Sequence, residues 1–198
     1  MEESATIAMS RKSRELKAQG KDVISLSLGE PDFNTPQFIK DAATEAMDNN
    51  FTKYMPVPGY DDLRESISNK FKRDNNLNYD KDQIVVSTGA KQSIANVVLT
   101  LINPGDEVII PAPFWVSYIE IVKVAGGVPV LVNAGIDKDF KISGKDLEKA
   151  ITPKTKLVIF STPCNPTGSV YDQEELRDLA DVIKIHPSLV VLCDEIYE

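Results

Sequence analysis

The sequence LVVLCDEIYE, residues 189–198, gives the clearest indication of the fold. It begins with five apolar residues, two of them β-branched valines, and this run predicts a strand buried on both faces of a parallel sheet. The run stops abruptly at Asp194. Because ligands of open α/β sheets bind outside the carboxyl ends of the strands, Asp194 is a candidate binding residue. A carboxylate that only caps a following helix would fit the same position.

A second segment, STPCNPTG at residues 161–168, also follows a buried apolar run, at residues 157–160. The same pattern predicts buried strands at residues 84–86, 108–110, 128–132 and 189–192, and a shorter strand at 23–26. Helices are predicted at residues 8–19, after Thr35-Pro36, and at 62–73, 92–101, 116–125, 145–150 and 174–185. Two of these helices, 145–150 and 174–185, are preceded by the residues of a capping box. The pairs are Ser143 with Asp146 and Asp172 with Glu175. The alternation of strands and helices predicts an α/β fold with a doubly wound, mostly parallel sheet.

Composition limits the function. The chain has 198 residues, 42% of them hydrophobic and 26% charged, with a net charge of −8, so no basic patch indicates nucleic acid. No apolar run is long enough to span a membrane. Two cysteines are too few for a disulfide framework, which favours a cytoplasmic protein. His186 is the only histidine, which excludes histidine-dependent triads and histidine-rich metal sites, and we expect no metal.

Three further positions carry candidate binding groups. Small residues in the turn 87–91 leave the amides of a helix start open to an anion such as a phosphate, although the spacing is not that of a Walker loop. Trp115, the only tryptophan, follows a predicted strand and offers either a stacking surface or ordinary core packing. Gly29 permits close approach by a ligand, and an ordinary turn needs such a glycine as well.

Six motifs occur along the chain: Gly29-Glu30-Pro31-Asp32-Phe33, Lys53-Tyr54 with Gly59, Gly89-Ala90-Lys91-Gln92, Trp115 after Pro113, Asn165-Pro166-Thr167-Gly168 and Asp194-Glu195-Ile196-Tyr197. In this order they closely resemble the class I and II aminotransferases, which are pyridoxal 5'-phosphate (PLP) enzymes of the aspartate aminotransferase fold. The bacterial aspartate aminotransferases are the branch that they resemble most. The resemblance implies a three-layer PLP-binding large domain over residues 35–198, incomplete here, preceded by an N-terminal arm and small-domain segment over residues 1–34.

The resemblance also implies the site. The implied cofactor-binding residues are Gly89, Ala90, Lys91, Trp115, Asn165, Asp194 and Tyr197, with Tyr54 reaching the cofactor phosphate of a partner subunit. The implied substrate-binding residues are Gly29, Trp115, Asn165 and Lys91. Tyr54 and Lys91 also fit ordinary surface residues. Asp194 is expected to face the pyridine nitrogen, Asn165 and Tyr197 its phenolic oxygen, and cis peptide bonds are expected before Pro113 and Pro166.

The implied function is transfer of an amino group between an amino acid, aspartate or a similar L-amino acid, and a 2-oxo acid in amino acid metabolism, by a homodimer. The chain stops at Glu198, before the family's Schiff-base lysine and its phosphate- and carboxylate-binding arginines, so no catalytic residue is assigned. We therefore expect an N-terminal fragment that is inactive alone and poorly soluble, because strands 84–86 and 189–192 would lack neighbours. The alternatives are a non-catalytic PLP-fold module and a PLP lyase of the same fold.

Overall fold

The computed structural model describes residues 5–25, 29 and 32–197. Two compact units divide the chain, residues 1–85 and residues 86–198, and each is described by itself. This division does not test the predicted domain boundary after residue 34, which stays a prediction.

The first unit is helical and mostly exposed. Its elements are α1 (Ala5–Ala18), α2 (Gln37–Asp48), α3 (Asp61–Asn75) and the 3-10 turn η1 (Lys81–Gln83). The one side chain of α3 that is buried is Arg64, whose Nε donates to the carbonyl of Ile84 at 3.0 Å. Its Nη atoms donate to Asp61 and Asp82, each at 3.1 Å, so the guanidinium ties α3 to the chain that follows η1. A buried charge is tolerated here because each of the three guanidinium nitrogens donates to an oxygen, two of them to carboxylates.

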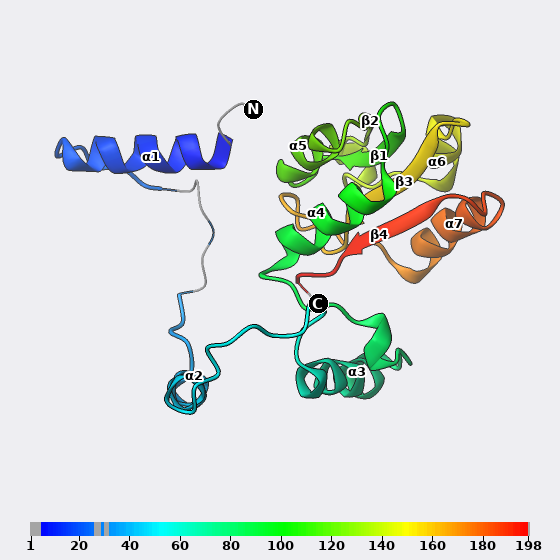
Figure 1. Cartoon of the computed structure of the whole chain (residues 1–198). Helices are drawn as coiled ribbons and strands as arrows, with labels where there is room; N and C mark the ends of the chain where they lie inside the picture. The colour runs from blue at the N-terminus through cyan, green and yellow to red at the C-terminus, as the bar shows by residue number, and fades with distance from the viewer. Residues whose placement is uncertain (1–4, 26–28, 30–31, 198) are drawn as a thin grey trace. The chain divides into compact units, whose positions relative to one another are not determined.

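The second unit alternates helices and strands as predicted (Figure 1). The elements are α4 (Ala90–Leu101), β1 (Glu107–Ala112), α5 (Ser117–Val124), β2 (Val128–Asn133), η2 (Ile136–Lys138), α6 (Gly144–Ala150), β3 (Thr155–Ser161), α7 (Gln173–Lys184) and β4 (Val190–Asp194). The strands form one parallel sheet in the order β2-β1-β3-β4. Both predicted capping boxes are confirmed at the starts of α6 and α7.

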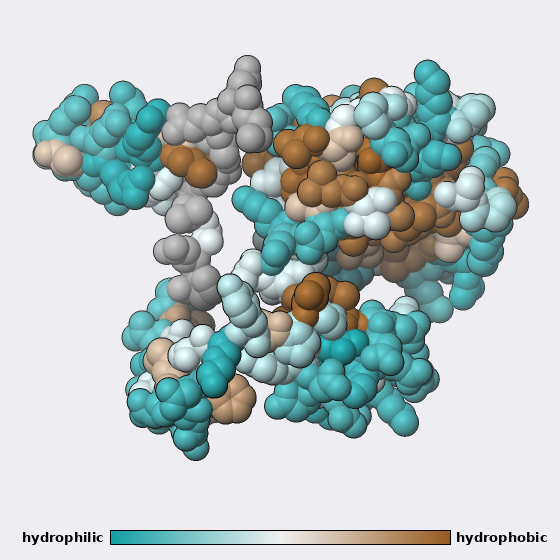
Figure 2. Space-filling model, viewed as in Figure 1, coloured by the Kyte–Doolittle hydropathy of each residue, from teal (hydrophilic) through white to brown (hydrophobic). Residues whose placement is uncertain are grey.

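Alternate residues of the two central strands serve two cores, one on each face of the sheet. Val108 and Ile110 of β1 pack with residues of α4 and α5, whereas Ile109, between them, packs with residues of α6 and α7. Strand side chains alternate between faces, so a continuous apolar run fills both layers. The predicted three-layer α/β architecture is therefore confirmed, and Figure 2 shows hydrophobic atoms gathered over this unit.

Three strand predictions were wrong in part. Residues 84–86 form no strand, because a strand needs a hydrogen-bonded neighbour and none of the described strands pairs with them. Residues 23–25 are irregular, and the rest of the predicted strand 23–26 lies outside the described residues. β2 was expected to be buried, yet Val128 is 46% exposed. In β4, Val190 and Val191 are 40% and 38% exposed, which agrees with the expectation that strand 189–192 lacks a neighbour in this chain. Both strands lie at edges of this sheet, where one neighbour is absent from the described part of the chain.

Candidate functional site

A cavity of about 320 Å³ opens at the edge of the sheet where β1, β3 and β4 end. It is lined by Gly89, Ala90, Lys91, Trp115, Ser161, Asn165, Asp194, Ile196 and Tyr197. All strands are parallel, so their carboxyl ends meet there, and the register places Ser161 of β3 opposite Asp194 of β4. Seven of the residues singled out in the sequence thus come together, although their binding roles stay predictions.

Asp194 is held by a buried tyrosine. The hydroxyl of Tyr118, on α5, donates to Oδ2 of Asp194 at 2.7 Å, and the tyrosine is only 1% exposed. Burial raises the pKa of Tyr118, and the hydrogen bond to Asp194 raises it further. The hydroxyl therefore stays protonated and donates throughout the physiological range. Among the described residues none donates to Oδ1 of Asp194, so this oxygen is available to a ligand in the cavity.

Trp115 forms an aromatic wall of the cavity. Its ring meets the ring of Tyr118 edge-on, with 5.5 Å between the centroids and 84° between the planes. On the indole, the ammonium of Lys91 lies 4.9 Å from the ring centroid, a distance typical of a cation–π contact. Lys91 is thus an exposed residue, as the simpler interpretation held, but one oriented over the cavity wall.

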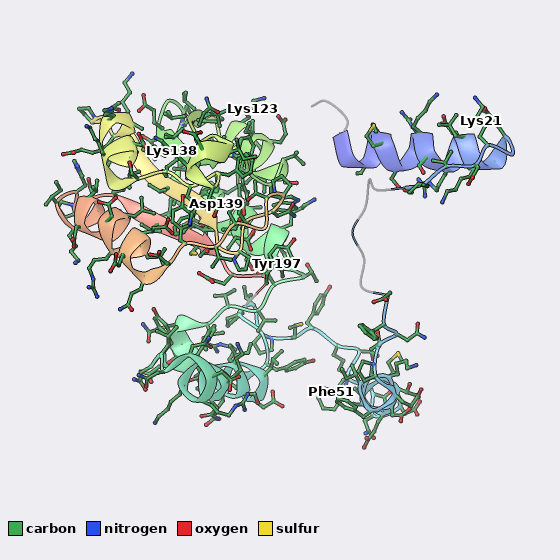
Figure 3. The ribbon with its side chains drawn as sticks, turned by 180° about the vertical axis from the view of Figure 1, so that it is seen from behind. Lys21, Phe51, Lys123, Lys138, Asp139 and Tyr197 are labelled. Carbon is green, nitrogen blue, oxygen red and sulfur yellow. The ribbon has the colours of Figure 1, made fainter. Side chains whose placement is uncertain are left out.

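Asn165 and Tyr197 form a hydrogen-bonding pair. Nδ2 of Asn165 donates to the hydroxyl of Tyr197 at 3.0 Å, and both side chains line the cavity (Tyr197 is labelled in Figure 3). The peptide bonds before Pro113 and Pro166 are cis, as predicted. A third cis bond, before Pro163, had not been predicted.

The start of α4 offers backbone donors. Gly89 has φ +91°, a conformation that side-chain-bearing residues rarely adopt, and it turns the chain into the helix. Within the described part of the chain the amides of Ala90 and Lys91 donate to no acceptor. Free amides and the helix dipole together favour an anion such as a phosphate.

These groups fit a flat, phosphorylated pyridine. The cavity presents a stacking face in Trp115, a carboxylate oxygen in Asp194, a paired amide and phenol in Asn165 and Tyr197, and open amides at the start of α4. A ring nitrogen, a phenolic oxygen and a phosphate would each find a partner of the right chemistry. The donor set therefore fits PLP.

Two predicted residues belong to the first unit. Tyr54 is fully exposed, and nothing lies within 4 Å of the position that a Cβ would take at Gly29. Exposure is compatible with a role toward a ligand or a partner but does not assign one, so both stay predictions.

Sequence reasoning missed Tyr118 and Ser161. Ser161 had a signal, because it is the first polar residue after the apolar run 157–160 and such residues point to a strand's carboxyl end. Tyr118 follows Trp115 by three residues, about one helical turn, but the side chain that it contacts lies 76 positions away in the sequence. Nothing local in the sequence indicates that contact.

Comparison with known proteins agrees with this geometry. Residues 21–198 match the family described as Aminotransferase class I and II. The chain is 52% identical over 195 residues to the probable aspartate/prephenate aminotransferase of Rickettsia bellii (strain RML369-C), covering 98% of this chain and 49% of the relative. It is 51% identical to the aspartate/prephenate aminotransferase of Nitrosomonas europaea, and the match covers 98% of this chain and 49% of that relative.

A solved structure, the aspartate aminotransferase from Thermus thermophilus with maleate, superposes with a TM-score of 0.95 at 42% identity, over 100% of this chain and 52% of that chain. The chain spans about half the length of the curated relatives that it matches.

Proposed function

The chain belongs to the class I and II aminotransferases, and on that premise we propose that it is the N-terminal half of a PLP-dependent enzyme that moves an amino group between an amino acid and a 2-oxo acid. PLP is the cofactor of this family. The observation that carries the proposal is Asp194, which has one oxygen held by Tyr118 and the other available in a cavity walled by Trp115.

When bound, PLP supplies an electron sink for the electrons released as the substrate's α-proton leaves. Asp194 favours the protonated ring nitrogen, because an adjacent carboxylate stabilises the cationic form. Asn165 and Tyr197 would hydrogen-bond to the phenolic oxygen of PLP. The amides of Ala90 and Lys91 would receive its phosphate, and Trp115 would stack on its ring.

An acidic amino acid such as aspartate is the proposed amino donor. Relatives at about half identity are named aspartate/prephenate aminotransferases. In this chain Lys91 places an ammonium over the cavity wall, where it can meet a substrate carboxylate. The family resemblance of the Tyr54 segment supports a homodimer in which Tyr54 serves the partner's phosphate, and the low cysteine count favours a cytoplasmic location. A fully active monomer in sedimentation would contradict that assembly.

The test uses the whole protein, purified with PLP and supplied with aspartate and 2-oxoglutarate. We expect stoichiometric formation of glutamate and oxaloacetate. A PLP lyase would release elimination or decarboxylation products instead, and a non-catalytic module would bind PLP without turnover. Either result would replace the proposed activity with the corresponding alternative.

A further inference from the structure

Two consecutive residues after η2 adopt an unusual backbone conformation. Asp139 and Phe140 have φ +50° and +58°, in the left-handed region that few residues other than glycine occupy. For a bulky aromatic residue such a φ is a clear outlier. A backbone persists there only when its surroundings over-determine it.

Those surroundings are the loop between β3 and α7, which carries Asn165. Lys141, the next residue, donates from Nζ to the carbonyl of Val170 at 3.2 Å and to Glu175 at 2.8 Å. Its ammonium also pairs with Asp139 at 3.3 Å, and the lysine side chain is only 15% exposed. The hydroxyl of Ser169, a buried residue, donates to the other oxygen of Asp139 at 3.4 Å.

Phe140 completes the contact from the same side. Together with Cys164 and Ser169 it lines a cavity of about 10 Å³, so little space is left between the two segments. Asp139, Phe140 and Lys141 therefore all meet this loop. Asp139 is labelled in Figure 3, close to Lys138, which belongs to η2.

Backbone hydrogen bonds within the loop connect Ser169 to the residue before Asn165. The amide of Cys164 donates to the carbonyl of Ser169 at 2.9 Å, and the amide of Gly168 donates back to Cys164 at 2.8 Å. These two bonds close residues 164–169 into a tight loop. A fixed Ser169 thus fixes Cys164, and Asn165 is the next residue.

We propose that Lys141 is a positioning residue for Asn165: the residues 139–141 form a brace that holds the Asn165 amide where it meets the cofactor's phenolic oxygen. The inference rests on the proposed function. Lys141 itself is absent from the lining of the site cavity and acts through Val170 and Ser169. The hydrogen bond to Glu175 raises the pKa of Lys141, so the brace stays charged at neutral pH.

The test replaces Lys141 by methionine in the whole protein, with Lys138→Met as a matched control. Lys138 also pairs with a carboxylate, that of Asp146 at 3.1 Å, but its side chain makes no hydrogen bond or ion pair with the loop among the described residues. An amide that donates to the phenolic oxygen favours its deprotonated form. Lys141→Met should therefore raise the pH midpoint of the bound cofactor's near-visible absorbance by about half to one pH unit and lower kcat about tenfold. Lys138→Met should leave both unchanged.

A double-mutant cycle with Asn165→Ala separates positioning from general damage. If Lys141 acts through Asn165, adding Lys141→Met to Asn165→Ala should shift neither the absorbance midpoint nor kcat further. Lys141→Leu, which also lacks a donor, serves as the second variant if the methionine variant does not fold, and it should show the same shift. The inference would be overturned if Lys141→Met left the midpoint unshifted, or if it shifted the midpoint equally in the Asn165→Ala background. Either result would leave the proposed function standing. A wild-type protein that binds no PLP would overturn the proposed function together with it.

Discussion

Removing one oxygen atom from Tyr118 tests how the site holds its key carboxylate. Tyr118→Phe keeps the ring in the core beneath α4 and α5, where the tyrosine is 1% exposed, and keeps its edge-on contact with Trp115. It deletes the 2.7 Å hydrogen bond to Oδ2 of Asp194. Asp194 is then free to rotate away from the ring nitrogen, and its partly buried oxygen loses its donor.

The size of the effect follows from the charge on the acceptor. A hydrogen bond to a charged group contributes about 1.5–3 kcal/mol, and a change of about 1.4 kcal/mol is tenfold in an equilibrium or rate constant. We therefore expect Tyr118→Phe to weaken PLP binding and to lower kcat, with a combined loss of about ten- to a hundredfold. Because burial raises the pKa of Tyr118, the hydrogen bond from Tyr118 to Asp194 should persist near pH 10, the ordinary pKa of a tyrosine, and its ionisation should cause no loss of PLP affinity there.

The assay is PLP titration followed by absorbance, with steady-state transamination of aspartate, both on the whole protein. The control is Val122→Ala, one turn further along α5 in the same core cluster, where the valine is fully buried. This substitution leaves a small cavity and should lower the free energy of unfolding without changing PLP affinity. Wild-type PLP affinity and kcat in Tyr118→Phe would refute the reasoning. An equal loss in Val122→Ala would show that only core packing matters.

Three further predictions follow from the same contacts. Asp194→Ala should lower kcat of the whole protein about a thousandfold or more, because it removes the charge partner of the ring nitrogen; near-wild-type turnover would contradict that role. Hydrogen bonds from the side chain and the amide of Ser143, and a weaker contribution from the Lys138 ammonium, lower the pKa of Asp146 from 3.8 to about 2. Charged Asp146 therefore stabilises the fold above about pH 4, and this stabilisation is lost as the pH falls through about 2. Chemical denaturation at a series of pH values should show a shallower acid loss of stability in Asp146→Asn, and parallel curves for the two proteins would argue against it. Residues 1–198 produced alone should be poorly soluble, because Val190 and Val191 leave an apolar edge on β4. They should not transaminate, because the Schiff-base lysine that the family resemblance implies is not among them. A soluble monomer that unfolds cooperatively would disprove the stability claim, and transamination by that monomer would disprove the fragment interpretation.

The sequence predicts the regular parts of this molecule well, because their signals are local. Capping boxes identify the starts of α6 and α7, and a polar residue after an apolar run identifies the carboxyl end of β3 or β4. The wrong predictions concern properties that depend on neighbours. An apolar run does not reveal whether another strand lies beside it, so the exposure of β2 was not predicted. The missing neighbours of residues 84–86 and 189–192 were expected only because the family resemblance placed the absent strands between them. The contact between Tyr118 and Asp194 joins residues that only the folded chain brings together.

The position of Trp115 gives the cavity an optical reporter. It is the only indole in these 198 residues, it lies in the cavity wall, and it is flanked by the edge of Tyr118 and the ammonium of Lys91. Indole fluorescence depends on nearby charge and on any chromophore stacked against the ring. Loading of the site and loss of the Lys91 ammonium would therefore each change the emission of one residue, so occupancy of this half of the protein can be followed without an attached label.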